Sequence, residues 1–356
     1  MPISPIAMSG DQVEPRVDAT RRFWAGHGRL TVSVTPVELR AGLQKADHAA
    51  RVAAHVEHLP RLAELPGTEP PAVYPDFGTI SQAEYWGCRD TSPVDIELPF
   101  AEPVAMSLDE ALAIEPASPD AAGFAADRAL RLRRDVSDQL GMEAKDLWLR
   151  TPDAQGVLNT GGMIVEQSEL LMGMVAESDK AHALLDRVGD WLLGYWRHLR
   201  AASGDRVGGN VWPHAFLPGD LGIALTEDLM PMLAPETFVE FGVPQLRKIE
   251  RAFGGLLVHC CGQWGRHAQT YTSERLNLLA AEFHYPYTTL DELAALPEQT
   301  VLIPYIALDK QNDFADVASY YHHLLDAAPA KRRFWFALIG DDAETLALAD
   351  SLSKRA

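Results

Sequence analysis

The pattern of hydrophobic and polar residues predicts strands and helices that alternate along the chain. Residues 29–36 read Arg-Leu-Thr-Val-Ser-Val-Thr-Pro, a β-branched, alternating run that is typical of a strand. Residues 125–140 and 179–202 carry apolar side chains at helical spacing and predict two long helices. Residues 156–162 contain three glycines and predict a loop. Further strands are expected over residues 210–212, 222–226, 256–258, 277–283, 300–306 and 333–339, and further helices over residues 38–65, 166–176, 235–253, 264–271, 290–296, 314–327 and 343–354.

Strands that alternate with helices indicate a parallel sheet with helices packed against it. For 356 residues we expect an α/β fold, most simply a closed (β/α)8 TIM barrel with extra N-terminal helices; an open doubly wound sheet is the alternative. Pro244 predicts a kink or break in the helix over residues 235–253. Because no linker or repeat divides the chain, residues 21–356 are predicted to form a single domain after a flexible N-terminal arm over residues 1–20.

Composition and charge narrow the class of protein. The formal net charge is 31 − 50 = −19, which disfavours binding to nucleic acid or to an anionic membrane. Three cysteines in a chain of this length argue against a disulfide framework and for a reducing compartment. The chain has no apolar run of about 18 residues and no signal-peptide pattern at its start, so we expect a cytoplasmic protein.

A histidine and two cysteines follow the apolar run of residues 256–258, where a strand is expected to give way to a loop. Side chains two residues apart on a strand point to the same side, so His259 and Cys261 can converge on one ion while Cys260 points the other way. Imidazole and thiolate are ligands of zinc, although a zinc site usually has three or four protein ligands. The alternative is that these are buried core residues, since cysteine is a common small apolar core residue.

Two carboxylates also stand at a predicted strand end. Glu227 and Asp228 follow the apolar run of residues 222–225, and adjacent carboxylates there can hold a metal or act as a general base. In a barrel enzyme the active site lies at the carboxyl ends of the strands, where these two residues are expected. The alternative for Asp228 is a cap for the next helix.

Four further residues are candidates for contact with a substrate or metal. His284 closes a predicted strand, and His214 follows a Trp-Pro pair in a rigid aromatic loop. Asp76 and Tyr74 lie in an early loop and are predicted to line a substrate pocket, although Asp76 is equally well explained as a turn residue.

Several passages resemble the uroporphyrinogen decarboxylase-like superfamily, closest in motif to its cobalamin-associated zinc methyltransferase branch. The Leu-Val-His-Cys-Cys-Gly run of residues 257–262 looks like the family's strand end with a His-x-Cys motif. The Glu-Asp pair at residues 227–228 and the Leu-Ala-Pro-Glu-Thr-Phe-Val-Glu-Phe run of residues 233–241 resemble its acidic pair and following helix. Residues 166–190 look like its long helical pair, and residues 23–26 and 30–36 also fit family members.

This resemblance implies a distorted TIM barrel with zinc held by His259 and Cys261 at the carboxyl ends of the strands. In the methyltransferase branch a late cysteine completes the zinc site, but residues 334–342 contain none. Asp341 is the positional candidate for the missing ligand, and His284, Glu282 and His214 also lie at predicted strand ends. An oxygen or second nitrogen ligand would make a harder site, suited to zinc or another divalent ion with a bound water.

The resemblance implies an enzyme that moves a methyl group between a small methylated substrate and a thiol or a corrinoid carried by a separate partner protein. Asp228 would orient the substrate or act as the base, with Glu227 beside it. The arginine-rich opening of the decarboxylase branch has no counterpart in residues 32–36, so a polyanionic porphyrinogen would lack cationic partners. A metal-assisted lyase or hydrolase and a non-catalytic binding protein are the alternatives. Barrels of this family commonly pair, so a homodimer is a further expectation.

Overall fold

The larger sheet has six parallel strands, in the order β1-β11-β10-β9-β8-β7. The computed structural model describes residues 10–355 apart from residues 40–42, 63, 68, 93–100, 213 and 311–312. Nearly every residue of these strands is buried, as expected of a parallel sheet covered on both faces. The strands are β1 (Leu30–Thr35), β7 (Ile223–Thr226), β8 (Leu256–Cys260), β9 (Leu278–Tyr285), β10 (Val301–Ile306) and β11 (Arg333–Ile339).

A second parallel sheet has the order β2-β5-β6, and a short antiparallel pair joins β3 to β4. An isolated parallel bridge between Gln155 and Thr226 connects the segment after β5 to β7. Among the described residues the ladders therefore form separate sheets, with β1 and β7 at the edges of the larger one. The α/β class with a parallel sheet is confirmed, and closure into an eight-stranded barrel stays a prediction. The additional strands are β2 (Ala72–Val73), β5 (Trp148–Thr151), β6 (Val207–Asn210), β3 (Arg89–Asp90) and β4 (Ala101–Glu102).

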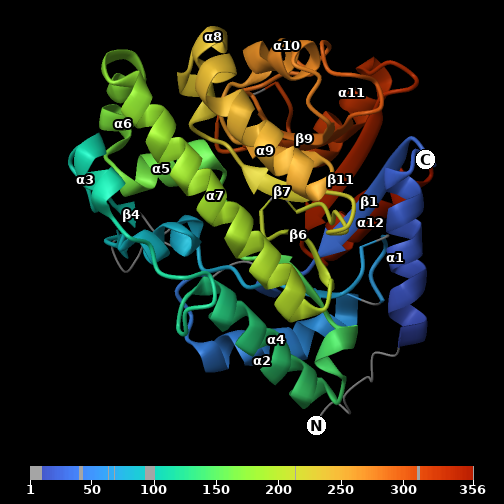
Figure 1. Cartoon of the computed structure of the whole chain (residues 1–356). Helices are drawn as coiled ribbons and strands as arrows, with labels where there is room; N and C mark the ends of the chain where they lie inside the picture. Colours follow the sequence, from blue (N-terminus) through green and yellow to red (C-terminus); the bar gives the residue numbers. More distant parts are fainter. Residues whose placement is uncertain are drawn as a thin grey trace.

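Helices cover the sheets in groups. The long helix α7 runs diagonally across the molecule, with α3, α5 and α6 against it, and α2 and α4 pack together below it (Figure 1). No helix in the described part of the chain is long and apolar enough to cross a membrane. The α-helices are α1 (Gly10–Trp24), α2 (His48–Leu62), α3 (Leu108–Ala113), α4 (Ala125–Leu140), α5 (Val157–Ile164), α6 (Gln167–Ala176), α7 (Ser178–Ser203), α8 (Pro235–Thr237), α9 (Val243–Phe253), α10 (Gly265–Ser273), α11 (Val317–Ala327) and α12 (Ala343–Ser353). The shorter turns are η1 (Val37–Leu39), η2 (Thr79–Ser81), η3 (Ala83–Trp86), η4 (Ala144–Asp146), η5 (Met230–Met232) and the π-helical η6 (Phe238–Gly242).

Residues 10–20, part of the flexible arm predicted over residues 1–20, belong to the helix α1 in the structure. Val13 and Val17 stand one helical turn apart and are both buried, so α1 has an apolar side that packs against the protein. Figure 1 shows α1 along one edge of the molecule. Residues 1–9 lie outside the described part of the chain.

Two local predictions are also corrected. Residues 156–162, expected as a loop, belong mostly to α5, and residues 290–296 form turns in place of the expected helix. The break that Pro244 predicts in the helix over residues 235–253 is confirmed: the π-helical turn η6 divides this helix, and Pro244 stands in the first turn of α9. Proline is tolerated in the first turn because its missing N–H has no helical partner there.

Candidate metal centre

His259 lies near the end of β8, inside the larger sheet. Its register partners are Thr226 on β7 and Glu282 on β9, so these three residues stand level on neighbouring parallel strands. Level residues of parallel strands project their side chains to the same face. His259 is 2% exposed, so its imidazole is surrounded by other side chains of the protein and has almost no contact with solvent.

A buried group of three donors forms where β8 and β9 run side by side. Glu282 and His284 are two residues apart on β9 and share one face. Glu282 Oε2 lies 3.2 Å from Nδ1 of His259, and Glu282 Oε1 lies 3.5 Å from Nε2 of His284. One ligand atom from each of the three residues lies within 4.8 Å of the other two. Two imidazoles and a carboxylate at this separation have the chemistry and the spacing of a zinc site.

A second group shares His259 and opens toward solvent. Asp228, which follows β7, accepts a hydrogen bond from the backbone N–H of Cys261 at 2.7 Å, and its Oδ1 lies 3.8 Å from Nε2 of His259. Donor atoms of Asp228, His259 and Cys261 lie within 4.8 Å of one another. Cys261 is exposed whereas Cys260 is fully buried, as predicted from their opposite directions on the strand. The two groups together comprise five candidate ligands, four of them around the imidazole of His259.

The electrostatics of the buried group favour a bound cation. Burial alone would raise the pKa of Glu282, but the adjacent His259 and His284 lower it to about 2. Burial opposes protonation of His259, yet Glu282 and Asp228 raise its pKa well above the usual value. The carboxylates thus create a negative potential at His259. Without a metal, a proton on the His259 ring balances this negative charge.

The buried group also has polar atoms that are available to bind an ion, because its internal contacts are long. The separations of 3.2 and 3.5 Å exceed the 2.7–2.9 Å of charge-assisted hydrogen bonds. Among the described residues, the buried atoms Glu282 Oε2 and His284 Nε2 make no aligned hydrogen bond. Since buried polar atoms normally have a partner, the donor set fits an ion that would draw these atoms together.

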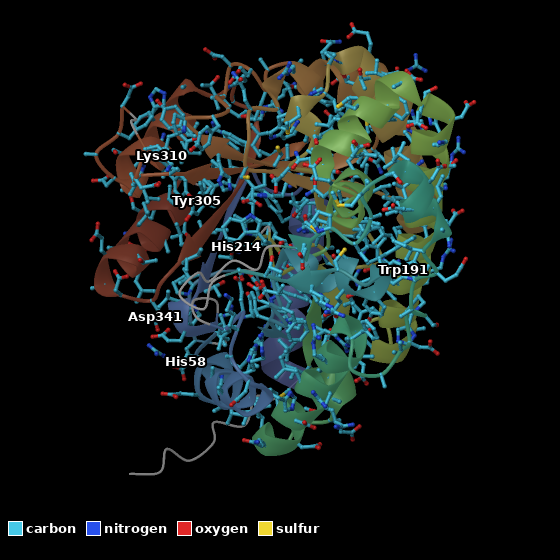
Figure 2. All side chains as sticks on the ribbon, turned by 90° about the vertical axis from the view of Figure 1, so that its left-hand side faces the viewer. His58, Trp191, His214, Tyr305, Lys310 and Asp341 are labelled. Carbon is cyan, nitrogen blue, oxygen red and sulfur yellow. The ribbon has the colours of Figure 1, made fainter. Side chains whose placement is uncertain are left out.

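Aromatic side chains form one wall of the cluster. The indole nitrogen of Trp212 lies 3.0 Å from the His259 ring nitrogens, and the indole ring meets His284 edge-on at 6.0 Å between centroids. Tyr305 packs on His284 at 4.7 Å. His214 is buried against the far part of this wall, 4.1 Å from the Trp212 ring, and belongs to neither donor group. Figure 2 shows His214 and Tyr305 near each other in the interior.

Glu227 occupies a different position from its neighbour Asp228. Its buried carboxylate faces the first backbone N–H groups of α5, from Val157, Leu158 and Asn159. Burial raises the pKa of Glu227 to about 8, although these N–H groups favour the charged form. A side chain on Gly156 would collide with this carboxylate. Glu227, directly after β7, therefore faces the start of α5 as a cap, and its catalytic role stays a prediction.

Tyr74 belongs to a buried structural network, and its place in the lining of a substrate pocket stays a prediction. Its hydroxyl donates to Glu69 Oε1 at 2.5 Å, and the Arg150 guanidinium lies over its ring at 4.6 Å. Arg150 also forms an ion pair with Glu69, and all three side chains are buried. The hydroxyl and the ring of Tyr74 are therefore both engaged by buried groups of the protein, which fix the side chain in place.

Asp76 belongs to a carboxylate pair that the sequence analysis did not identify. It is buried, accepts hydrogen bonds from the Gly78 N–H at 2.9 Å and from Gln44 Nε2 at 3.0 Å, and lies outside both donor groups. Burial and the nearby Asp76 raise the pKa of Asp153 to about 7, and His259 also acts on this group. Asp153 follows β5 with a φ of 21°, uncommon for a residue other than glycine. Neither its backbone strain nor its neighbours could be read from the sequence.

The structure places Asp341, the candidate for the missing ligand, in contact with α2. Its carboxylate forms an ion pair with Arg61 of α2, and it is absent from both donor groups. In Figure 2 Asp341 lies beside His58, which also belongs to α2, and away from His214 and Tyr305. The Gly340 turn after β11, with a φ of 116°, directs the chain toward α2. Glu282 and His284 are better placed as the further ligands.

Comparison with known proteins identifies a shared fold and no family. No protein family matches the chain, and no curated protein matches it. Among solved structures, a methyltransferase from Methanosarcina mazei superposes with a TM-score of 0.64 at 12% identity, over 96% of this chain and 97% of that one. A putative vitamin-B12 independent methionine synthase from Listeria monocytogenes matches 64% of this chain and 69% of that one, with 12% identity and a TM-score of only 0.37. The first match shows that the whole chain has the fold of that methyltransferase.

Proposed function

We propose that this protein is a metal-dependent methyltransferase whose active site is the cluster around His259. The observation that carries this proposal is the convergence of five donors at neighbouring strands β7, β8 and β9. The full-length likeness of fold to a methyltransferase supports methyl transfer as the reaction. At 12% identity fold alone does not fix function, so the argument rests on the site.

Zinc fits the donor set best, because nitrogen, sulfur and oxygen ligands occur together. His259 would be the shared ligand, completed by Cys261 and Asp228 toward solvent or by Glu282 and His284 in the interior. When bound there, the metal would deprotonate a thiol or water ligand and so supply a nucleophile or a leaving group for methyl transfer.

The residues of the chain orient and protect such a centre. Glu282, next to Nδ1 of His259, fixes the ring so that Nε2 faces Asp228. The Trp212 wall and the burial of His259 exclude water from the inner side of the cluster. Asp153, with a pKa near 7, can hold or release a proton close to the cluster at neutral pH. The substrate we propose is a small methylated molecule, and the acceptor is a thiol or a corrinoid on a separate protein.

A second candidate is a metal-assisted lyase of the decarboxylase type, or a hydrolase. The observation that favours it is the donor set itself, which contains one sulfur among five ligands, with the rest carboxylates and imidazoles. Such a harder site suits a metal-bound water. The Asp76 and Asp153 carboxyls nearby would serve acid–base steps in that chemistry.

The first test is the metal content of the purified protein and of two neighbouring variants. We expect about one zinc per chain in the wild type, loss or marked weakening in Cys261→Ser, and full retention in the matched control Cys260→Ser. Cys260 is buried on the other side of the strand, so its substitution changes stability without removing a ligand. Protein that holds no metal, even after zinc is added, would rule out both metal-dependent candidates and leave a metal-free lyase or a non-catalytic binding protein.

The reaction class is then tested with the zinc-loaded protein and methylcobalamin. Absorbance reports whether methylcobalamin loses its methyl group to an added thiol. Such a transfer supports the methyltransferase, provided that Cys261→Ser abolishes the transfer. A zinc-loaded protein that leaves methylcobalamin unchanged with every thiol, yet cleaves activated esters or decarboxylates β-keto acids, would favour the second candidate.

A further inference from the structure

A cavity lies between α2, α4 and the turn η2, and none of its lining residues belongs to the metal cluster. It encloses about 450 Å³, within the range of small-molecule sites. Lys45, Arg51, Arg128 and Arg131 line it, against two acidic residues, Glu84 and Asp90. Four cations less two anions give the lining a net charge of +2, in a chain whose formal charge is −19. This local reversal of sign is the first observation that points to an anionic ligand.

Arg51 places a buried positive charge in the wall of the cavity. The residue is 5% exposed, and its guanidinium donates to the backbone carbonyls of Ala46, Gln44 and Asp76. In the described part of the chain it has no ion pair with a carboxylate. Burial lowers the pKa of Arg51 to about 10, which leaves it charged at neutral pH. The three hydrogen bonds of the guanidinium all go to neutral carbonyls, and the nearby carboxylates of Asp76 and Asp47 balance its charge only through space. A ligand anion in the cavity would compensate this buried charge further.

Phe77 joins two of the cations and provides an apolar surface. The guanidinium carbons of Arg51 and Arg128 lie 4.6 and 4.5 Å from the centre of its ring, so both groups stack against it. Arg128 is held in place by Glu84 at 3.1 Å. Ile80 lies beside Phe77 in the lining. The cavity thus combines fixed guanidinium groups with an apolar floor, the arrangement that recognises a planar anion attached to an apolar body.

We infer that this cavity binds a small organic anion, with a phosphate or carboxylate group against the arginines and an apolar part against Phe77 and Ile80. Lys45 and Arg131, which are exposed at the mouth, attract the anion and contact its outer oxygens. None of these residues belongs to the metal cluster, so the inference is independent of the proposed methyl transfer.

The test is calorimetric titration of the full chain with phenyl phosphate, benzoate and inorganic phosphate at constant ionic strength. We expect saturable binding of at least one aryl anion, tighter than about 1 mM. If phenyl phosphate binds more tightly than benzoate, the cavity is a phosphate site. If benzoate binds more tightly, it is a carboxylate site. Inorganic phosphate should bind more weakly than phenyl phosphate because it lacks the apolar part. No saturable binding of any probe up to about 10 mM overturns the inference.

Two charge reversals on α4 separate a built site from general attraction of anions. Arg131→Glu should weaken binding at least about tenfold, because it removes a charged contact and adds repulsion. Arg134→Glu makes the same change of charge on the same exposed helix but outside the cavity, and it should change the affinity less than twofold. Equal losses in both variants would overturn the inference. Because both side chains are exposed, folding is retained, and Lys45→Gln offers a second test at another residue of the lining.

Discussion

At the scale of single residues, Glu282 has the greatest influence on the proposed centre because it contacts both buried imidazoles. We predict that Glu282→Gln lowers zinc affinity at least about tenfold, since the amide keeps the shape but removes the charge that balances a cation. Competition with a zinc chelator measures this. The control Glu240→Gln breaks a surface pair with His182 and should leave affinity unchanged. If both variants bind zinc like the wild type, the metal is not held by the inner group.

A second residue-scale prediction concerns pH and His55. This histidine is fully buried, with Nδ1 donating to the Arg51 carbonyl at 2.7 Å and Nε2 accepting from the Tyr74 N–H at 3.0 Å. Burial lowers its pKa from 6.5 to about 4. The unfolded chain therefore takes up the proton first as pH falls below 6.5, and about 3 kcal/mol of stability is lost by pH 4.

Urea unfolding between pH 7.5 and 4.5 checks this effect of pH. In His55→Gln the free energy of unfolding should start lower at pH 7.5, because a buried hydrogen bond is lost, and then fall less steeply than in the wild type. His58→Gln, on the same helix and only partly buried, should keep the wild-type slope. A His55→Gln slope identical to that of the wild type would contradict the prediction.

At the scale of elements, α5 depends on a residue from another strand for its N-terminal cap. Gly156 at the cap position supplies no side chain, and Glu227 faces the first N–H groups in its place. We predict that Glu227→Ala lowers the free energy of unfolding by about 1–2 kcal/mol, whereas Glu227→Gln, which keeps an acceptor oxygen, costs less. Zinc binding should survive in both. If Glu227→Gln is as stable as the wild type but loses all activity, Glu227 is a catalytic group after all.

The same element shows why part of the fold could not be predicted from sequence. The strands of the larger sheet are short, apolar and bounded by polar residues, so their local pattern located them, together with His259 and Cys261. Residues 156–162 look like a loop because of their glycines, and contacts with distant parts of the chain, among them the carboxylate of Glu227 and the packing of α7, stabilise them as a helix. The assignment of the metal ligands likewise depends on contacts between residues that are far apart in the sequence. Asp341 is at a strand end as expected, but Arg61 from α2 binds it, and Glu282 becomes central because its register places it level with His259.

At the scale of the whole molecule, the two ends of the described chain are packed on each other. β1 pairs with β11 over its full length, and Phe23 and Trp24 at the end of α1 contact Trp335 of β11 at 5.6 and 5.5 Å between ring centres. Arg333 of the same strand lies over the Phe23 ring at 4.3 Å. The N-terminal helix is thereby part of the core that supports the larger sheet, and the metal cluster lies on other strands of that sheet, β8 and β9.

This arrangement predicts that α1 contributes to global stability and not to metal binding. Val17 is 3% exposed, and Val17→Ala removes two methyl groups from the core, so we expect the free energy of unfolding to fall by about 2 kcal/mol. Asp18→Ala, at the adjacent exposed position, should change it by no more than about 0.5 kcal/mol. Zinc affinity should be the same in both variants, because no ligand lies on α1. Were Val17→Ala as harmless as Asp18→Ala in urea unfolding, residues 10–20 would behave in solution as the flexible arm that their sequence suggests.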